Sequence, residues 1–158
     1  MDLAKGRLIE ATLAHPYEFM IPDVMLAQEL LDLGAYTAVD LLRLGFKLGE
    51  LDGDGVGRAL GHYQNHHKDL SLNDCFALTL AEQNVCILMT GDASLRAIAA
   101  KVGLEVHGLL WVAEQIRDSL TCPIGQLLNG LEILERDPLV RLPRGQLLDL
   151  IAKLRRRA

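Results

Sequence analysis

Residues 86–92 read Cys-Ile-Leu-Met-Thr-Gly-Asp, and this short stretch decides the fold class. Its run of apolar residues up to Thr90 is typical of a central strand of a parallel sheet, covered by other elements on both faces. Gly91 and Asp92 then turn the chain into a helix that apolar spacing predicts over residues 94–102. A buried strand that leads directly into a helix is the repeating unit of an alternating α/β fold.

The same alternation extends to both sides of this unit. The patterns predict strands over residues 19–21, 46–51, 86–90 and 105–107, with helices over residues 2–15, 22–33, 35–44, 56–66, 72–83, 94–102 and 109–120. We therefore expect an α/β domain over residues 1–120, a parallel sheet with helices on both faces. Residues 121–158 contain two further amphipathic helices and no strand, which predicts a helical C-terminal hairpin that packs on this domain or pairs with a partner.

The composition narrows the class of protein. Half of the residues are hydrophobic but only 4% are aromatic, so we expect an aliphatic core. The longest apolar run, residues 85–89, is far shorter than the roughly 20 residues that cross a bilayer, so no membrane partner is expected. The three cysteines form no CxxC pair, and we interpret them as buried thiols of a soluble, cytoplasmic protein.

The net charge of −5 argues against a protein that binds nucleic acid through a broad basic surface. A negative net charge is compatible with a metal-dependent nuclease, because such enzymes hold metal ions with carboxylates and bind the phosphates through those ions.

Three acidic residues are expected near the carboxyl ends of the strands, where a parallel sheet holds its active sites. Asp92 follows the strand over 86–90, Asp74 lies in the first turn of the helix leading into it, and Glu29 lies in the helix after residues 19–21. Oxygen ligands of this kind suit Mg²⁺ or Mn²⁺. Each acid also has a structural interpretation: Asp74 can cap its helix together with Ser71, Asp92 is a natural N-cap, and Glu29 fits a solvated helix face.

Three blocks of the sequence together resemble the PIN-domain family. They are Ile-Pro-Asp-Val at 21–24 followed by Glu29, Leu-Ser-Leu-Asn-Asp-Cys-Phe-Ala-Leu at 70–78, and Leu-Met-Thr-Gly-Asp-Ala-Ser-Leu-Arg at 88–96. Gly-Leu-Glu-Val-His-Gly at 103–108 continues the match, which spans about residues 3–118. The Ser-x-x-Asp and Thr-Gly-Asp blocks are the specific part of the resemblance, and the block around Glu29 is loose.

The resemblance implies a small α/β endoribonuclease that cuts single-stranded RNA with metal-activated water, as toxins of toxin–antitoxin pairs do. It places the metal ligands on Asp74, Asp92 and Glu29, with Gln28 as the alternative if the register slips by one residue. Thr90 and Ser71 fall on positions that support the site. An antitoxin protein is then an expected partner.

One departure from the family concerns its first central strand and the Asp that ends it. Here the residues from Met1 onward already have the pattern of the first helix, so that strand and its acid are missing. We therefore expect either that the strand lies upstream of Met1, or that the chain is weak or inactive as a nuclease and serves as a binding module. The strands over 19–21 and 86–90 would then pair directly or borrow a strand from a second copy, which favours a homodimer. A phosphatase-like hydrolase is disfavoured because no Asp-x-Asp motif ends a strand.

Two other groups of residues have competing interpretations. His62 and His66 are one helical turn apart and could chelate a metal, but no third ligand is evident, so a solvated polar face is favoured. Lys153 and the arginines at 155–157 could contact RNA phosphates, or could complement the dipole of their own helix end.

Overall fold

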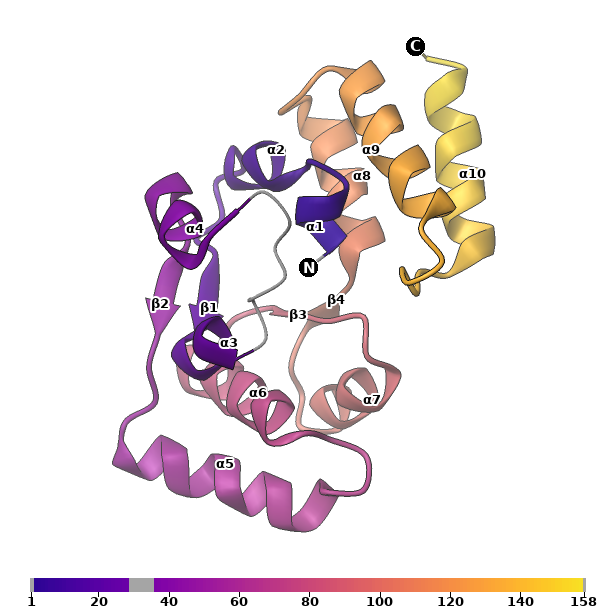
Figure 1. The fold of residues 1–158 in the computed structure, drawn as a ribbon. Coiled ribbons are helices and arrows are strands. Elements are labelled where there is room, and N and C mark those ends of the chain that lie inside the picture. The colour runs from indigo at the N-terminus through magenta and orange to yellow at the C-terminus, as the bar shows by residue number, and fades with distance from the viewer. Residues whose placement is uncertain (1, 29–35, 158) are drawn as a thin grey trace.

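The structure is a computed structural model, and it describes residues 2–28 and 36–157. The helices are α1 (Asp2–Lys5), α2 (Ile9–Leu13), α3 (Asp23–Gln28), α4 (Ala38–Leu44), α5 (Gly53–His66), α6 (Leu72–Asn84), α7 (Ala93–Lys101), α8 (Leu109–Ser119), α9 (Ile124–Arg136) and α10 (Arg144–Arg155). The strands are β1 (Met20–Pro22), β2 (Lys47–Gly49), β3 (Leu88–Met89) and β4 (Val106–His107). Figure 1 shows α8, α9 and α10 side by side at the upper right, away from α5 and α6.

The predicted α/β class with parallel strands is confirmed, and most elements begin and end within a few residues of their predicted bounds. Two details were wrong. The helix expected over 2–15 is broken between α1 and α2, where Arg7 adopts a φ of 54°. Pro22 is the last residue of β1 and not the first residue of a helix, since α3 begins at Asp23.

The expectation of one continuous sheet is wrong for the described strands. β1 pairs with β2, and β3 pairs with β4, as two separate parallel pairs of strands. The expected direct pairing of β1 with β3 does not occur: among the described strands, no ladder of hydrogen bonds joins the two pairs. Each strand is only two or three residues long, so each pair offers few backbone bonds to extend a sheet. A strand contributed by a second copy stays a prediction.

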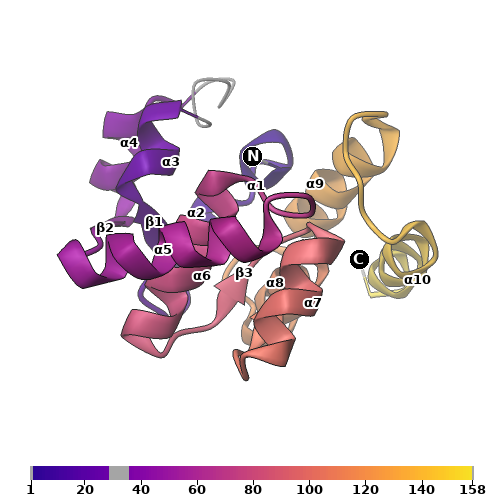
Figure 2. The same ribbon diagram turned by 90° about the horizontal axis from the view of Figure 1, so that it is seen from below.

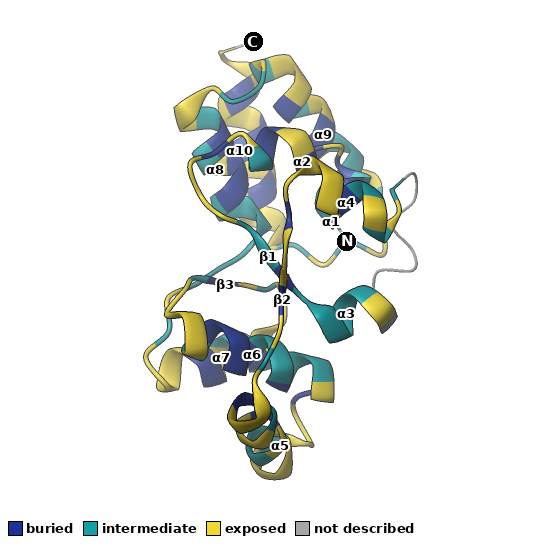
Figure 3. Cartoon of the chain, turned by 90° about the vertical axis from the view of Figure 1, so that its left-hand side faces the viewer, coloured by how far each residue is buried: buried dark blue, intermediate teal, exposed yellow. Residues whose placement is uncertain are grey.

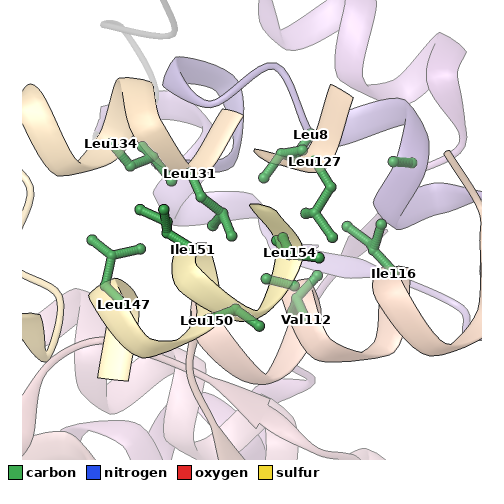
Figure 4. Packing of buried hydrophobic residues seen from close by; sticks show 12 residues of the cluster. Leu8, Val112, Ile116, Leu127, Leu131, Leu134, Leu147, Leu150, Ile151 and Leu154 are labelled. Carbon is green, nitrogen blue, oxygen red and sulfur yellow. The ribbon is translucent and has the colours of Figure 1, made fainter. Parts of the chain in front are cut away.

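Three aliphatic clusters form the core. One lies around β1 and α4, and includes Ile9, Leu41 and Phe46. A second lies between α6, α7 and the β3–β4 pair. The largest lies between α8, α9 and α10, whose buried faces are dark blue in Figure 3. Figure 4 shows its side chains interlocking, with Leu127, Leu131 and Leu134 from α9 facing Leu147, Leu150, Ile151 and Leu154 from α10.

The largest cluster also includes residues from the beginning of the chain. Leu8, which is completely buried, and Ala11 pack with the residues of α8, α9 and α10. Lys5 forms an ion pair with Asp137 directly after α9, at 3.1 Å. The core therefore extends across the boundary at residue 120, although the division into a domain and an extension stays a prediction.

A close backbone approach holds α9 against the start of the chain. A Cβ added to Gly130 would collide with the backbone carbonyl of Gly6 and would lie 3.0 Å from Leu8 Cδ2. Because a backbone carbonyl cannot rotate away as a side chain can, only glycine fits at position 130.

We predict that Gly130→Ala lowers the free energy of unfolding by about 1–3 kcal/mol, because the methyl group overpacks this contact. Gly125→Ala, in the same helix, is the matched control, since a Cβ there meets nothing within 4 Å. It should leave stability unchanged or raise it by about 0.5–1 kcal/mol. Urea unfolding measures both variants. Equal effects would contradict the close packing of α9 on the first residues.

Candidate functional site

Asp74 lies in the first turn of α6, where it forms a capping box with Ser71. Its backbone N–H donates to Ser71 Oγ at 3.1 Å, while its Oδ2 accepts from the Ser71 N–H at 2.9 Å and from the Ser71 hydroxyl at 2.7 Å. The predicted capping arrangement is thus confirmed, and Ser71 fixes the orientation of the Asp74 carboxylate.

Asp92 is the N-cap of α7, as its structural interpretation predicted. Its Oδ1 accepts from the Leu95 N–H at 2.7 Å. Its own N–H donates to Thr90 Oγ1 at 3.1 Å, so the threonine that follows β3 helps to hold the turn into α7. Thr90 therefore stands in contact with Asp92, as Ser71 does with Asp74.

The helices that begin with the two acids pack in one layer with β3. β3 runs back alongside α6, and α7 follows next to it, as Figure 2 shows. α6 contacts both β3 and α7, so the helices that carry Asp74 and Asp92 are neighbours.

Glu29 lies outside the described residues, and so does the side chain of Gln28, so the choice between them stays open. Over residues 2–28 and 36–157, no group of three His, Cys, Asp or Glu side chains is placed to hold a metal ion. Asp74 and Asp92 alone would supply two of the expected ligands.

Helix capping uses only part of each carboxylate. Hydrogen bonds from other described residues reach Oδ2 of Asp74 and Oδ1 of Asp92, and leave the second oxygen of each side chain for a further ligand. The donor set therefore fits a hard divalent cation that takes one or two carboxylates and keeps several waters.

Next to Asp92 begins a cleft of about 440 Å³, which we call the Trp111 cleft. Thr90 and Gly91 from the end of β3, His107 and Gly108 from the end of β4, and the first turn of α8 line one side of it. The loop after α9 and one face of α10 line the other side, with Arg141, Gln146, Asp149 and Lys153 among the lining residues.

Arg96 links the two strand ends at the base of this cleft. It lies one turn after Asp92 on α7, and its Nη1 donates to the Thr90 carbonyl at 3.3 Å. A Cβ at Gly108 would lie 3.2 Å from the same nitrogen, so the glycine leaves room for the guanidinium.

An aromatic stack forms another part of the wall. The rings of His107 and Trp111 lie parallel, with centroids 4.2 Å apart and planes 5° apart, and Tyr17 lies 5.8 Å beyond Trp111. His107 Nε2 is bonded to Glu105 at 2.7 Å, which fixes the plane of the imidazole.

No local pattern in the sequence indicates a role for Arg96, His107, Trp111 or Arg141, and Lys153 stands out only as part of a basic helix end. These residues come from α7, β4, α8, the loop after α9, and α10, and only the packing of the helices brings them together. The one signal in the sequence was Trp111, the single tryptophan of a chain with few aromatic residues.

Two other groups that the sequence singled out form contacts with neighbouring helices. His62 Nε2 is 3.1 Å from Glu82 on α6, and its ring stacks beside that of His66. Arg155 forms an ion pair with Glu132 on α9 at 2.6 Å, so it joins α10 to α9.

No family model, no curated protein and no solved structure matches this chain. Within the described part of the chain, none of the helices combines the length and the apolar character needed to cross a membrane.

We predict that the two substitutions Asp92→Ala and Asp92→Asn separate the capping role of this residue from any other role. Alanine removes the acceptor for the Leu95 N–H and should lower the free energy of unfolding by about 1 kcal/mol, whereas asparagine caps a helix about as well as aspartate. Thermal unfolding without added metal measures both. Equal losses would show that the cap does not account for the stability.

The three cysteines differ in exposure, which partly corrects the expectation of buried thiols. Cys75 is buried, Cys122 is half-buried and Cys86 is exposed. Burial, with the adjacent Asp74 carboxylate adding to it, raises the pKa of Cys75 to about 11. Because the thiolate is the reactive form, Cys75 stays protonated and unreactive at any pH well below that value.

We therefore predict that iodoacetamide at pH 8 labels Cys86 first and Cys75 last in the folded protein. Peptide mass spectrometry over time measures the order, and the same reaction in guanidinium chloride, where all three thiols are exposed, is the control. Labelling of Cys75 as fast as Cys86 in the folded protein would contradict the packing around α6.

Proposed function

We propose that the chain is a divalent-metal-dependent endoribonuclease of the PIN type, in which Asp74, Asp92 and Glu29 hold Mg²⁺ or Mn²⁺. The observation that carries this proposal is that α6 and α7, which contact each other, each begin with an oriented carboxylate that keeps one oxygen for a further ligand. The proposed reaction, cleavage of single-stranded RNA by metal-activated water, comes from the resemblance of the Ser-x-x-Asp and Thr-Gly-Asp blocks to the family.

A bound Mg²⁺ or Mn²⁺ would supply an activated water and polarise the phosphodiester that it attacks. The protein's part is to hold its ligands still before the substrate arrives. Ser71 holds the Asp74 carboxylate through two hydrogen bonds, and the Asp92 carboxylate is held by the Leu95 N–H. A ligand oriented in this way loses little freedom on binding metal, which favours a precise site.

The second candidate is a binding module that has the fold without the activity. It is favoured by the capping bonds themselves, since both acids would be needed at these helix starts even without a metal. In either case we propose an antitoxin protein as a partner in the cytoplasm, on the basis of the family resemblance. A second copy of the chain is a further proposed partner, because the described strands form only two-stranded pairs with open edges.

We predict that the protein cleaves unstructured single-stranded RNA in the presence of Mn²⁺ and not in EDTA. Asp74→Asn and Asp92→Asn should each lower the rate by at least about 100-fold, because each removes a charged metal ligand while keeping a capping side chain. Gel analysis of a labelled oligoribonucleotide measures the rate.

The matched control for these variants is Asp52→Asn. Asp52 is the N-cap of α5 and accepts from the Gly55 N–H at 2.6 Å, so the substitution changes the same kind of cap at a helix start outside the site. It should leave cleavage unchanged. Wild-type protein that does not cleave RNA with any divalent metal would overturn the nuclease and leave the binding module.

A further inference from the structure

The Trp111 cleft lies where a parallel α/β layer normally receives its ligands. Thr90 and Gly91 follow β3, and His107 and Gly108 stand at the end of β4, so both carboxyl ends open into it. Its volume of about 440 Å³ falls in the range of small-ligand sites. Asp74 and Asp92 are not among its lining residues, so it is a separate site that begins directly beside Asp92.

Three cationic side chains gather around this cleft in a chain whose net charge is −5. Arg96 donates to a backbone carbonyl, and neither Arg141 nor Lys153 forms an ion pair with another described residue. Arg141 and Lys153 are exposed, so their charges are available to a ligand without breaking an existing contact.

Two carboxylates at the same cleft would repel a simple anion. Glu114 lies 4.0 Å from Arg117, which offsets part of its charge, and Asp149 lies one turn before Lys153 on α10. The lining therefore carries three positive charges against two negative ones, and a lone phosphate would be held weakly. A ligand that binds here needs a second kind of contact.

The His107–Trp111 stack offers that contact. The stacked rings cover each other's inner faces, so a base can stack only on an outer face of the pair, and such stacking is worth about 1–3 kcal/mol per base. The start of α8 adds the positive end of its helix dipole, and no side chain caps this helix at Gly108. A flat ring next to cations is the chemistry that recognises a nucleotide.

We infer that the Trp111 cleft binds one nucleoside phosphate unit of single-stranded RNA, with the base on the His107–Trp111 stack and the phosphate near Arg141, Lys153 and Arg96. The inference rests on the proposed function in taking RNA as the polymer. A free mononucleotide has the same chemistry and is the other source of this ligand. The cleft then holds the strand beside Asp92 and contributes to affinity without touching the reacting bond.

Trp111 is the only tryptophan, so its fluorescence reports directly on this cleft. We predict saturable quenching when a uridine octaribonucleotide is added in EDTA, at low salt. Because EDTA removes divalent metal, cleavage does not enter the measurement, and an inactive enzyme would still bind. A loss of binding and a loss of nuclease activity are thus distinguishable.

The variant that tests the phosphate contacts is Arg141→Gln combined with Lys153→Gln. It should weaken binding about tenfold and reduce the slope of log Kd against log salt by about 1.4, since each contact on a single strand contributes about 0.7. Arg43→Gln combined with Lys68→Gln is the control, because it removes the same charge from exposed positions on α4 and after α5. It should bind as the wild type does.

Competition identifies the source of the ligand. Displacement of the octamer by uridine monophosphate at similar concentration supports a free nucleotide, and displacement by oligomers alone supports RNA. Three results would overturn the inference: no quenching by either ligand, equal binding by the two double variants, or inorganic phosphate competing as well as the nucleotide.

Discussion

The packing of α8 against α9 and α10 is the interaction on which the arrangement of this molecule depends. α8 buries Val112, Ala113 and Ile116 in the largest aliphatic cluster, while its first turn carries Trp111 into the cleft. Removing apolar surface from water is the main driving force for this contact, at roughly 25 cal/mol per Å². Because α8 also follows β4 directly, this one helix fixes the position of α9 and α10 relative to the ends of β3 and β4.

The capping residues at the helix starts also have two effects at once. Ser71 with Asp74, and Thr90 with Asp92, satisfy backbone N–H groups that a helix beginning leaves without partners. Those bonds hold one carboxylate at the start of α6 and the other at the start of α7. A metal site and a stable helix start are therefore not competing explanations here, since each carboxylate has two oxygens and capping occupies one.

Local chemistry made the helices predictable. The Ser71–Asp74 capping box and the Asp92 cap are both encoded within four residues, and the structure has both. The strand expected over 86–90 is shorter in the structure, because Val85 adopts a left-handed conformation and the Cys86 N–H bonds back to Ala81. A short apolar run could not reveal this, since its residues suit a strand or the end of a helix equally well.

Contacts between distant parts of the chain were harder to predict. Nothing in the pattern of residues 19–21 and 86–90 says which strands pair, so the separation into two parallel pairs emerged only from the structure. The Trp111 cleft likewise joins residues from 90 to 153, which tertiary packing alone brings together. The close approach of Gly6 and Gly130 has no local signature either, because a glycine within a helix has many possible reasons.

The proposal that Asp74 and Asp92 share one divalent cation is tested most directly by a crystal soaked in Mn²⁺. An anomalous difference map measured at the manganese absorption edge locates the ion without assumptions about activity. The account predicts one strong peak at bonding distance from a carboxylate oxygen of each residue, and its loss in Asp92→Asn crystals. A map without a peak between these two side chains, or with manganese bound only elsewhere, would contradict it.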